Sequence, residues 1–256
     1  MKKILITGAA RGLGRCLGES LSKEGNIVYG TTSSLRSEYN HESFKLLNLD
    51  LRDEKSIDRL ASHFIESDEP IDVLIHNAGI AYLDPTDYLE ESEIRHIFDV
   101  NFFGPINLTK KLLPQMRKAN KGHLIFISSI VSIDHWPFLG VYSASKAAIE
   151  SVAFEWAVLL KKWNIHVSVI RPNPLQTDMQ ILRSKNIKPS PYSDLPIRDL
   201  KWENIDDVCK IISKIVNEPS TQFAFQTGPH SQKTAEHFLN ESAYDSSLAQ
   251  YQQHFS

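Results

Sequence analysis

The segment Thr7-Gly8-Ala9-Ala10-Arg11-Gly12-Leu13-Gly14 follows the apolar run Ile4-Leu5-Ile6 and begins a helical pattern. Glycines at this point permit a tight turn between a strand and a helix. They also let the backbone approach a pyrophosphate at the helix N-terminus. Their spacing, G-x-x-x-G-x-G, differs from the common G-x-G-x-x-G fingerprint, which therefore does not apply directly. Taken alone, the segment predicts either a dinucleotide-binding turn or a plain structural turn.

Outward from this segment, short β-rich runs alternate with amphipathic helical patterns. The repeated β-α-β order predicts an α/β fold, a doubly wound parallel sheet with helices on both faces, formed as a single domain by residues 1–256. Strands buried on both faces should be continuously apolar, as Val73-Leu74-Ile75 is. The expected strands are Lys3–Thr7, Ile27–Thr31, Phe44–Asn48, Ile71–His76, His123–Ser128, His166–Arg171 and Gln222–Gln226. The expected helices lie near residues 13–24, 54–67, 89–119, 141–163 and 204–217.

Two later stretches fall outside this alternation. Residues 172–203 contain Pro172, Pro174, Pro189, Pro191 and Pro196 among polar and aromatic residues. A long segment with so many helix breakers predicts a lid or a substrate-binding loop. Residues 227–256 are polar, and we expect them to form either a surface helix or a loosely ordered tail.

Composition narrows the class of protein. The 256 residues carry a formal charge of -3, which argues against a strongly basic nucleic-acid binder. The two cysteines, Cys16 and Cys209, lack metal-ligand spacing, so no metal site is expected. Two cysteines cannot form a disulfide framework, which favours a reducing compartment. No signal-peptide pattern or run long enough to span a bilayer is seen, so we expect a cytoplasmic protein.

The end of the second expected strand bears on cofactor choice. Arg11 would stand at the positive end of a helix, which is unfavourable unless an anion offsets it. A solvated arginine is the alternative. The strand ends in Thr31-Thr32-Ser33 without the carboxylate that usually holds the ribose 2′-hydroxyl of NAD. These hydroxyls, with Arg11 or Arg36 nearby, would accept the 2′-phosphate of NADP, so NADP(H) is predicted over NAD(H). Asp50 could bond the adenine edge, although a bare aspartate is more often a turn residue.

Tyr142-Ser143-Ala144-Ser145-Lys146 begins the helical pattern after the fifth expected strand. Spacing of i and i+4 places Tyr142 and Lys146 on one helix face. An adjacent ammonium would lower the phenol pKa from about 10 toward the working range of an acid-base catalyst. Ser129 ends the fifth strand, at the same edge, where its hydroxyl could bond a substrate carbonyl; a helix or loop cap is the alternative.

A proline close to Asn101 provides a separate argument. Pro105 has no N–H to donate to the Asn101 carbonyl, four residues earlier. If this stretch is helical, that carbonyl is free for a water and the helix should kink. A proline kink without function is the alternative.

Together these residues resemble the short-chain dehydrogenase/reductase family over about residues 1–180. The matching elements are Thr7–Gly14, His76-Asn77-Ala78-Gly79, Asn101, Ser129, Tyr142 and Lys146. The resemblance implies a Rossmann-type fold. Phe223-Ala224-Phe225-Gln226-Thr227-Gly228 looks like the steroid- and retinol-dehydrogenase-like branch. Two departures are His76 in place of asparagine and Asn173 in place of the glycine after Pro172; we expect Asn173 to keep the turn by adopting a positive φ.

The resemblance assigns roles to individual residues. Ser129 would orient the substrate oxygen, and Tyr142 would act as general acid/base. Lys146 would bind the nicotinamide ribose and lower the pKa of Tyr142, while Asn101 would hold a water of the proton relay. The expected cofactor contacts are Gly8, Arg11, Gly12, Leu13, Gly14, Thr31, Thr32, Ser33, Asp50, Leu51, Asn77, Ala78, Gly79, Tyr142, Lys146, Pro172 and Thr177.

These observations predict an oxidoreductase that transfers a hydride between NADP(H) and a carbonyl or alcohol carbon of a small molecule. The apolar and aromatic residues of 130–139, with Tyr192 and Trp202, favour a hydrophobic substrate, although core packing explains part of this pattern. A non-catalytic NADP(H)-binding redox sensor and an isomerase or dehydratase are the alternatives. By resemblance we expect a homo-oligomer, a dimer rather than a tetramer, formed through the helices near 90–118 and 141–163.

Overall fold

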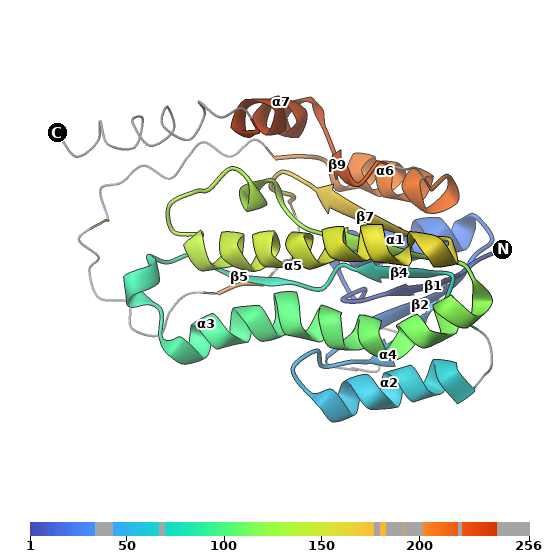
Figure 1. Ribbon diagram of the computed structural model, residues 1–256. Coiled ribbons are helices and arrows are strands. Elements are labelled where there is room, and N and C mark those ends of the chain that lie inside the picture. Colours follow the sequence, from blue (N-terminus) through green and yellow to red (C-terminus); the bar gives the residue numbers. More distant parts are fainter. Residues whose placement is uncertain are drawn as a thin grey trace.

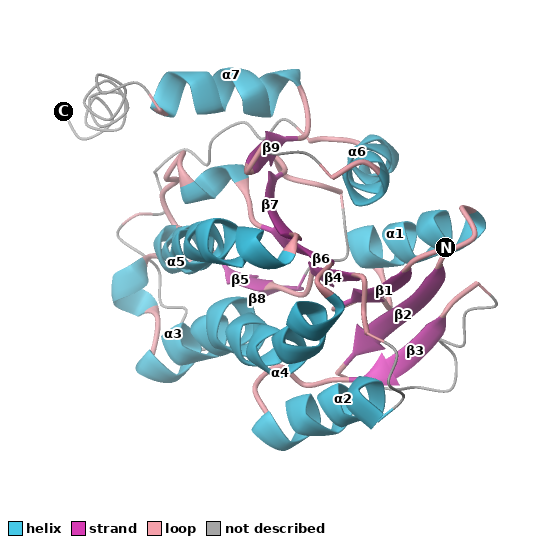
Figure 2. Ribbon diagram, turned by 45° about the vertical axis from the view of Figure 1, so that its right-hand side comes forward, coloured by secondary structure: helices cyan, strands magenta, loops and turns pink. Residues whose placement is uncertain are grey.

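The computed structural model describes residues 1–33, 43–66, 70–176, 180–182, 192, 202–219 and 222–239. Its centre is a seven-stranded sheet in the order β3-β2-β1-β4-β6-β7-β9, in which every neighbouring pair is parallel. This confirms the predicted doubly wound fold. Figure 1 shows this sheet among the helices, and Figure 2 labels each of its strands. The strands are β1 (Lys3–Ile6), β2 (Ile27–Thr32), β3 (Lys45–Asn48), β4 (Val73–His76), β6 (Gly122–Ile127), β7 (Ile165–Arg171) and β9 (Ala224–Gln226).

Helices cover both faces of this sheet, as Figure 2 shows. One face carries α1 (Gly12–Lys23) and α6 (Ile205–Asn217), and the other carries α2 (Glu54–Glu66), α4 (Gly104–Ala119) and α5 (Gly140–Leu159). Successive strand residues point to opposite faces. Leu5 therefore joins the cluster under α2, α4 and α5, while Ile4 and Ile6 join the cluster under α1 and α6. This is why the strands are continuously apolar.

The expected helix at 89–119 is interrupted in the structure. It consists of α3 (Glu91–Phe98), a π-helical turn η3 (Asp99–Phe103) and α4. The Gly104 N–H donates to the Asp99 carbonyl, five residues earlier, and Pro105 lies in the first turn of α4. Because proline cannot continue the i to i−4 ladder, the chain takes one wider turn here. The helical ladder is thus interrupted at Asn101 by a π-helical turn, and the kink that the sequence predicts there stays a prediction.

Several short elements were not expected from the sequence. β5 (Ile80–Tyr82) pairs in parallel with β8 (Gln180–Leu182) in a separate two-stranded sheet. The 3-10 turns are η2 (Thr86–Tyr88), η4 (Ile130–Ser132) and η5 (Leu160–Trp163). After β9 the chain forms α7 (Pro229–Phe238), so the helical alternative holds for the described part of the C-terminal segment.

Two further observations concern the described residues only. None of their helices combines the length and apolar character needed to cross a bilayer. They also contain no group of three or more histidine, cysteine or acidic side chains arranged to hold a metal ion.

Candidate active site

The carboxyl ends of the central strands meet at one edge of the sheet. Ile6 pairs with Ile75, His76 with Phe126, and Ile127 with Ile170. The segments that follow β1, β4, β6 and β7 are therefore neighbours. The strand order reverses direction between β1 and β4, and ligands of open α/β sheets bind at such a switch point.

The glycine-rich segment after β1 is a compact turn with no room for side chains. Gly8 and Gly12 have φ values of 69° and 55°, in the left-handed region that favours glycine. A Cβ on Gly14 would lie 2.4 Å from the Gly8 carbonyl oxygen and 2.5 Å from Nδ2 of Asn77. A Cβ on Gly8 would lie 2.9 Å from Cα of Ala78. The turn thus packs directly on the segment after β4.

Hydrogen bonds fix this packing. Asn77 Nδ2 donates to the carbonyls of Thr7 (2.9 Å) and Gly8 (3.0 Å). In return, Thr7 Oγ1 accepts from the N–H groups of Asn77 and Ala78, both at 3.0 Å. Arg11 is exposed at the N-cap of α1, and its side chain makes no capping hydrogen bond. The first N–H groups of α1 and this guanidinium together form a site suited to an anion.

The end of β2 supports the same turn. Thr31 is buried, its hydroxyl accepts from the Gly8 N–H (3.3 Å), and its carbonyl accepts from the Ala9 N–H (2.8 Å). In this structure Thr31 therefore supports the turn, and its contact with a cofactor phosphate stays a prediction. Thr32 is half-buried and Ser33 is exposed. Arg36 and Thr177, both expected near the cofactor, lie outside the described residues.

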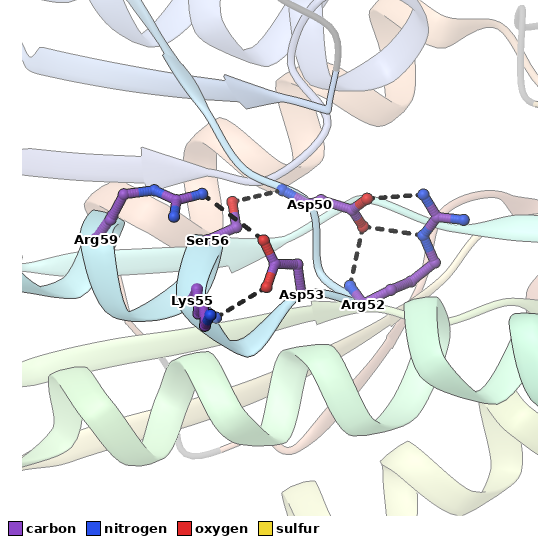
Figure 3. Close-up of polar contacts among 6 residues, drawn as sticks. All are labelled: Asp50, Arg52, Asp53, Lys55, Ser56 and Arg59. Atoms are coloured by element: carbon purple, nitrogen blue, oxygen red, sulfur yellow. Dashed lines mark hydrogen bonds and ion pairs between the residues drawn. The ribbon is translucent and has the colours of Figure 1, made fainter.

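Asp50 follows β3 and binds Arg52 (Figure 3). Its carboxylate accepts from Arg52 Nε (2.9 Å), Nη2 (2.7 Å) and the Arg52 backbone N–H (3.0 Å). These bonds, led by the side-chain one, lower the pKa of Asp50. Asp50 thus has the turn role that the sequence left as the alternative, and its contact with the adenine edge stays a prediction. Leu51 is buried against Gly104, where a Cβ would lie 2.6 Å from Cβ of Leu51.

Ser129, Tyr142 and Lys146 meet at the edge of the sheet. Tyr142 and Lys146 occupy the first two turns of α5 and are 7% and 5% exposed. Lys146 Nζ lies 5.7 Å from the centroid of the Tyr142 ring. Ser129 caps η4, where its Oγ accepts from the Val131 N–H (3.4 Å), and its hydroxyl is close enough to the phenol to act on the pKa of Tyr142. The three side chains that the sequence singled out are therefore brought together.

The pKa values differ from the expected pattern. Burial raises the pKa of Tyr142 to about 12, against the opposing effect of its hydrogen bond with Ser129. The predicted net lowering of the Tyr142 pKa is wrong for this arrangement, because burial dominates at the phenol and Lys146 Nζ donates to the Ile127 carbonyl (2.8 Å). Burial also lowers the pKa of Lys146 to about 8, while the nearby Glu150 acts in the opposite direction. At neutral pH the pair is a neutral phenol beside an ammonium.

Asn101 joins η3 to the site through its side chain. It is 2% exposed; Oδ1 accepts from the Ile80 N–H (3.0 Å), and Nδ2 donates to the Ile80 carbonyl (2.9 Å) and to Ser145 Oγ (3.0 Å). A Cβ on Gly79 would lie 3.3 Å from Lys146 Nζ and 3.4 Å from Asn101 Oδ1. Asn101 therefore lies beside Lys146 and fixes β5 against α5. Water binding at its carbonyl stays a prediction.

The segment after β7 is built differently from the expectation. Asn173 has no positive φ, so the predicted left-handed turn is wrong. Its buried side chain instead donates through Nδ2 to Oε1 of Glu203 (3.0 Å), an acceptor that the sequence gave no means of assigning. Glu203 also accepts from the hydroxyls of Thr227 and Ser231. The Pro172 carbonyl accepts from the Ile130 N–H (3.0 Å), which ties this segment to the one carrying Ser129.

The residues expected near the substrate divide into two groups. Ile130 is buried in a cluster with Tyr142 and Ala81, so core packing accounts for it. Other members of the 130–139 loop are half-buried at the border of this cluster, namely Ile133, Trp136 and Leu139. Trp202 is 50% exposed. Half-buried apolar side chains beside the phenol suit a hydrophobic substrate.

Sequence reasoning missed Glu150 at this edge and named His76 only as a departure from the family. Glu150, four residues after Lys146, binds Arg171 and two serines; the i, i+4 spacing was the available signal. His76 proves structural, because its Nε2 bonds with Thr109 Oγ1 (2.8 Å) and burial lowers its pKa to about 3.

A doubly wound parallel sheet with a glycine turn at its switch point, and a Ser-Tyr-Lys group at the same edge of the sheet, is the arrangement of a dinucleotide-binding oxidoreductase domain. The family profile described as "short chain dehydrogenase" matches residues 2–188, and the chain belongs to this family.

Relatives and solved structures agree with this assignment. The chain is 32% identical over 237 residues to a 3-ketodihydrosphingosine reductase of Bacteroides thetaiotaomicron, covering 88% of this chain and 87% of the relative. It is 28% identical over 244 residues to retinol dehydrogenase 8 of Bos taurus, covering 84% and 78%. A short-chain dehydrogenase structure from Streptomyces avermitilis matches with a TM-score of 0.85 at 26% identity, covering 98% of this chain and 96% of the other. These relatives agree with the predicted branch.

Two more distant structures share the fold and contain cofactors. A short chain dehydrogenase from Burkholderia cenocepacia in complex with NADP has a TM-score of 0.76 at 22% identity, with 94% and 93% of the two chains covered. A 3-ketoacyl-(acyl-carrier-protein) reductase from Brucella melitensis complexed with NADH has a TM-score of 0.74 at 22% identity, with 88% and 96% covered. The fold thus accommodates either nicotinamide cofactor.

Proposed function

We propose that this chain reduces a carbonyl to an alcohol, or catalyses the reverse oxidation, on a small hydrophobic molecule with a nicotinamide cofactor. The observation that carries this proposal is the meeting of Ser129, Tyr142 and Lys146 beside the glycine turn. The bound cofactor supplies or accepts the hydride. The substrate oxygen gains or loses the matching proton at the Tyr142 hydroxyl.

The side chains have distinct parts in this proposal. Ser129 lies within hydrogen-bonding reach of the phenol, so one substrate oxygen can contact both hydroxyls. With a pKa near 12, Tyr142 holds its proton at neutral pH and serves as a donor to a carbonyl that gains negative charge. The ammonium of Lys146, with its Nζ 5.7 Å from the centroid of the Tyr142 ring and both groups buried, would offset part of the charge of the phenolate left behind.

The turn after β1 fits the pyrophosphate of a dinucleotide. Added Cβ atoms on Gly8 or Gly14 would collide with neighbouring backbone, so the turn keeps the close approach that a pyrophosphate needs. We propose NADP(H) as the preferred cofactor. This is supported by the exposed Arg11 at the α1 N-cap and by the sequence Thr31-Thr32-Ser33 at the end of β2, which contains no aspartate or glutamate.

The assembly and location also stay proposals. Phe154 and Val158 on α5 are 58% and 60% exposed and one helical turn apart, so they share a face. A homodimer through α4 and α5 would cover them. Analytical ultracentrifugation of the parent and of a Val158→Glu variant tests this, since a monomeric parent contradicts it. A cytoplasmic location remains a prediction.

The test of the proposed function is oxidation of NADPH by the purified protein. The panel should contain long-chain ketones, steroid-like ketones and retinoid-like aldehydes, each repeated with NADH. Turnover that is lost in Tyr142→Phe, with NADPH affinity retained, is the expected result. A fully active Tyr142→Phe variant contradicts the role of the phenol. NADPH binding with no turnover on any compound would favour the redox-sensor alternative.

A further inference from the structure

A buried carboxylate lies behind the Ser-Tyr-Lys group. Glu150 sits on α5, one helical turn beyond Lys146, and is 8% exposed. Its Oε1 accepts from Ser128 Oγ (2.5 Å) and Ser132 Oγ (2.6 Å). Its carboxylate also binds Arg171, with Nε at 3.1 Å from each oxygen and Nη2 at 2.5 Å from Oε2. We call these four residues the Glu150 cluster.

The partners of Glu150 come from the two segments that border the reacting groups. Ser128 immediately precedes Ser129, and Ser132 ends the η4 turn that Ser129 caps. Ser129 therefore lies between two hydroxyls that donate to one carboxylate oxygen. Arg171 is the last residue of β7 and immediately precedes Pro172.

Backbone hydrogen bonds connect the same two segments. The Ser128 N–H donates to the Ile170 carbonyl (2.8 Å), and the Ile130 N–H donates to the Pro172 carbonyl (3.0 Å). Three elements are therefore connected to one another. The Glu150 cluster joins α5 to η4 and to the end of β7, and the backbone bonds join η4 to the segment after β7. A shift of any one segment would strain the other two.

Stability alone is a weak reason for such a cluster. Removing two charges from water is unfavourable, and a buried ion pair can often be replaced by apolar side chains without loss. A polar network in which every donor and acceptor is satisfied instead specifies one arrangement of its members. The Glu150 carboxylate can accept about four hydrogen bonds, and four donors surround it: Nε and Nη2 of Arg171 and the hydroxyls of the two serines.

We propose that Glu150 is a positioning residue that sets where the Ser129 hydroxyl and the Pro172 segment lie relative to Tyr142 and Lys146. This inference rests on the proposed function, because the positions it fixes matter for proton transfer. Misplacing a reacting group by a fraction of an ångström lowers the rate without weakening cofactor binding in proportion. The expected signature is a fall in kcat at constant affinity for the cofactor.

Deleting hydroxyls tests the proposal more gently than removing a buried charge. Ser128→Ala and Ser132→Ala each remove one hydrogen bond to Glu150. Ser168→Ala is the matched control, because Ser168 is 0% exposed and its Oγ bonds with His123 Nε2 (2.8 Å), on the sheet but away from the site. We expect the double variant Ser128→Ala/Ser132→Ala to lose about tenfold in kcat with the Kd for NADPH within about twofold of the parent. The control should keep its kcat.

A second measurement does not depend on turnover. Hydrogen-deuterium exchange should become several-fold faster at the Ser128 and Ile130 amides in the double variant and stay unchanged there in Ser168→Ala. Unchanged exchange at both amides, or a kcat loss no larger than in the control, overturns the proposal. If the parent itself turns over no substrate, the proposed function fails, and the exchange data alone decide whether the Glu150 cluster fixes these segments.

Discussion

Replacing Lys146 with methionine should stabilise the protein while removing its proposed activity. Burial lowers the pKa of this ammonium from 10.5 to about 8, despite the opposing effect of Glu150. At about 1.4 kcal/mol per pKa unit, holding the charge costs about 3 kcal/mol at neutral pH. Methionine cannot donate to the Ile127 carbonyl, and the loss of this hydrogen bond lowers the free energy of unfolding by about 1 kcal/mol. We expect Lys146→Met to raise the free energy of unfolding by about 2 kcal/mol.

The pH dependence gives this prediction its sign. Between about pH 8 and pH 10.5 the unfolded lysine is protonated while folded Lys146 has released its proton. Because the unfolded state binds more protons there, the parent gains stability as the pH rises through this window. The variant lacks this titration. Its advantage should therefore be complete below about pH 8 and shrink toward pH 10.5.

Urea denaturation at neutral pH and near pH 10 measures both effects. In thermal denaturation of a chain of this size, a gain of about 2 kcal/mol in the free energy of unfolding corresponds to a rise in Tm of about 4–8 °C. Lys111→Met is the control, because Lys111 forms an exposed ion pair with Asp58 and should change stability little. A Lys146→Met variant less stable than the parent at neutral pH, or an advantage that persists at high pH, would refute the reasoning.

Three further predictions concern the cofactor and the rate. The kcat/KM of ketone reduction with NADPH should be level near neutral pH and fall about tenfold per unit above about pH 8, as Lys146 loses its proton; a flat profile contradicts this. Gly14→Ala should abolish NADPH binding in a fluorescence titration, because its Cβ would lie 2.4 Å from the Gly8 carbonyl oxygen; an unchanged Kd would count against a pyrophosphate site there. Arg11→Ala should weaken NADPH binding about tenfold with little effect on NADH; equal weakening of both removes the argument for a 2′-phosphate contact.

The fold was predictable because its signals are local. Strands buried on both faces are continuously apolar, and Pro105 marks the π-helical turn through the hydrogen bond that it cannot donate. β5 and β8 were missed because three residues carry no periodicity, and their pairing joins segments about a hundred positions apart.

The site shows the same division. Tyr142 and Lys146 share a helix face, so spacing predicts their meeting. The carboxylate of Glu203 is 30 residues from Asn173, and that of Glu150 is 21 residues from Arg171. No sequence pattern connects such pairs, because each contact depends on how separate elements pack. The sequence predicted a lowered pKa for Tyr142, whereas burial raises it, for a related reason. Spacing identifies the neighbouring ammonium but not the depth at which both groups are buried.

Burial of the Tyr142–Lys146 pair affects both the stability of the protein and the preferred direction of the proposed reaction. The low-dielectric surroundings that raise the pKa of Tyr142 to about 12 also lower that of Lys146 to about 8. As folded, the site favours a neutral phenol that can give a proton, which suits the reduction of a carbonyl. For the oxidation, the phenol must first release its proton, and the ammonium must stabilise the resulting phenolate. The rate of alcohol oxidation should therefore rise with pH until Lys146 loses its own charge, whereas reduction needs no such step.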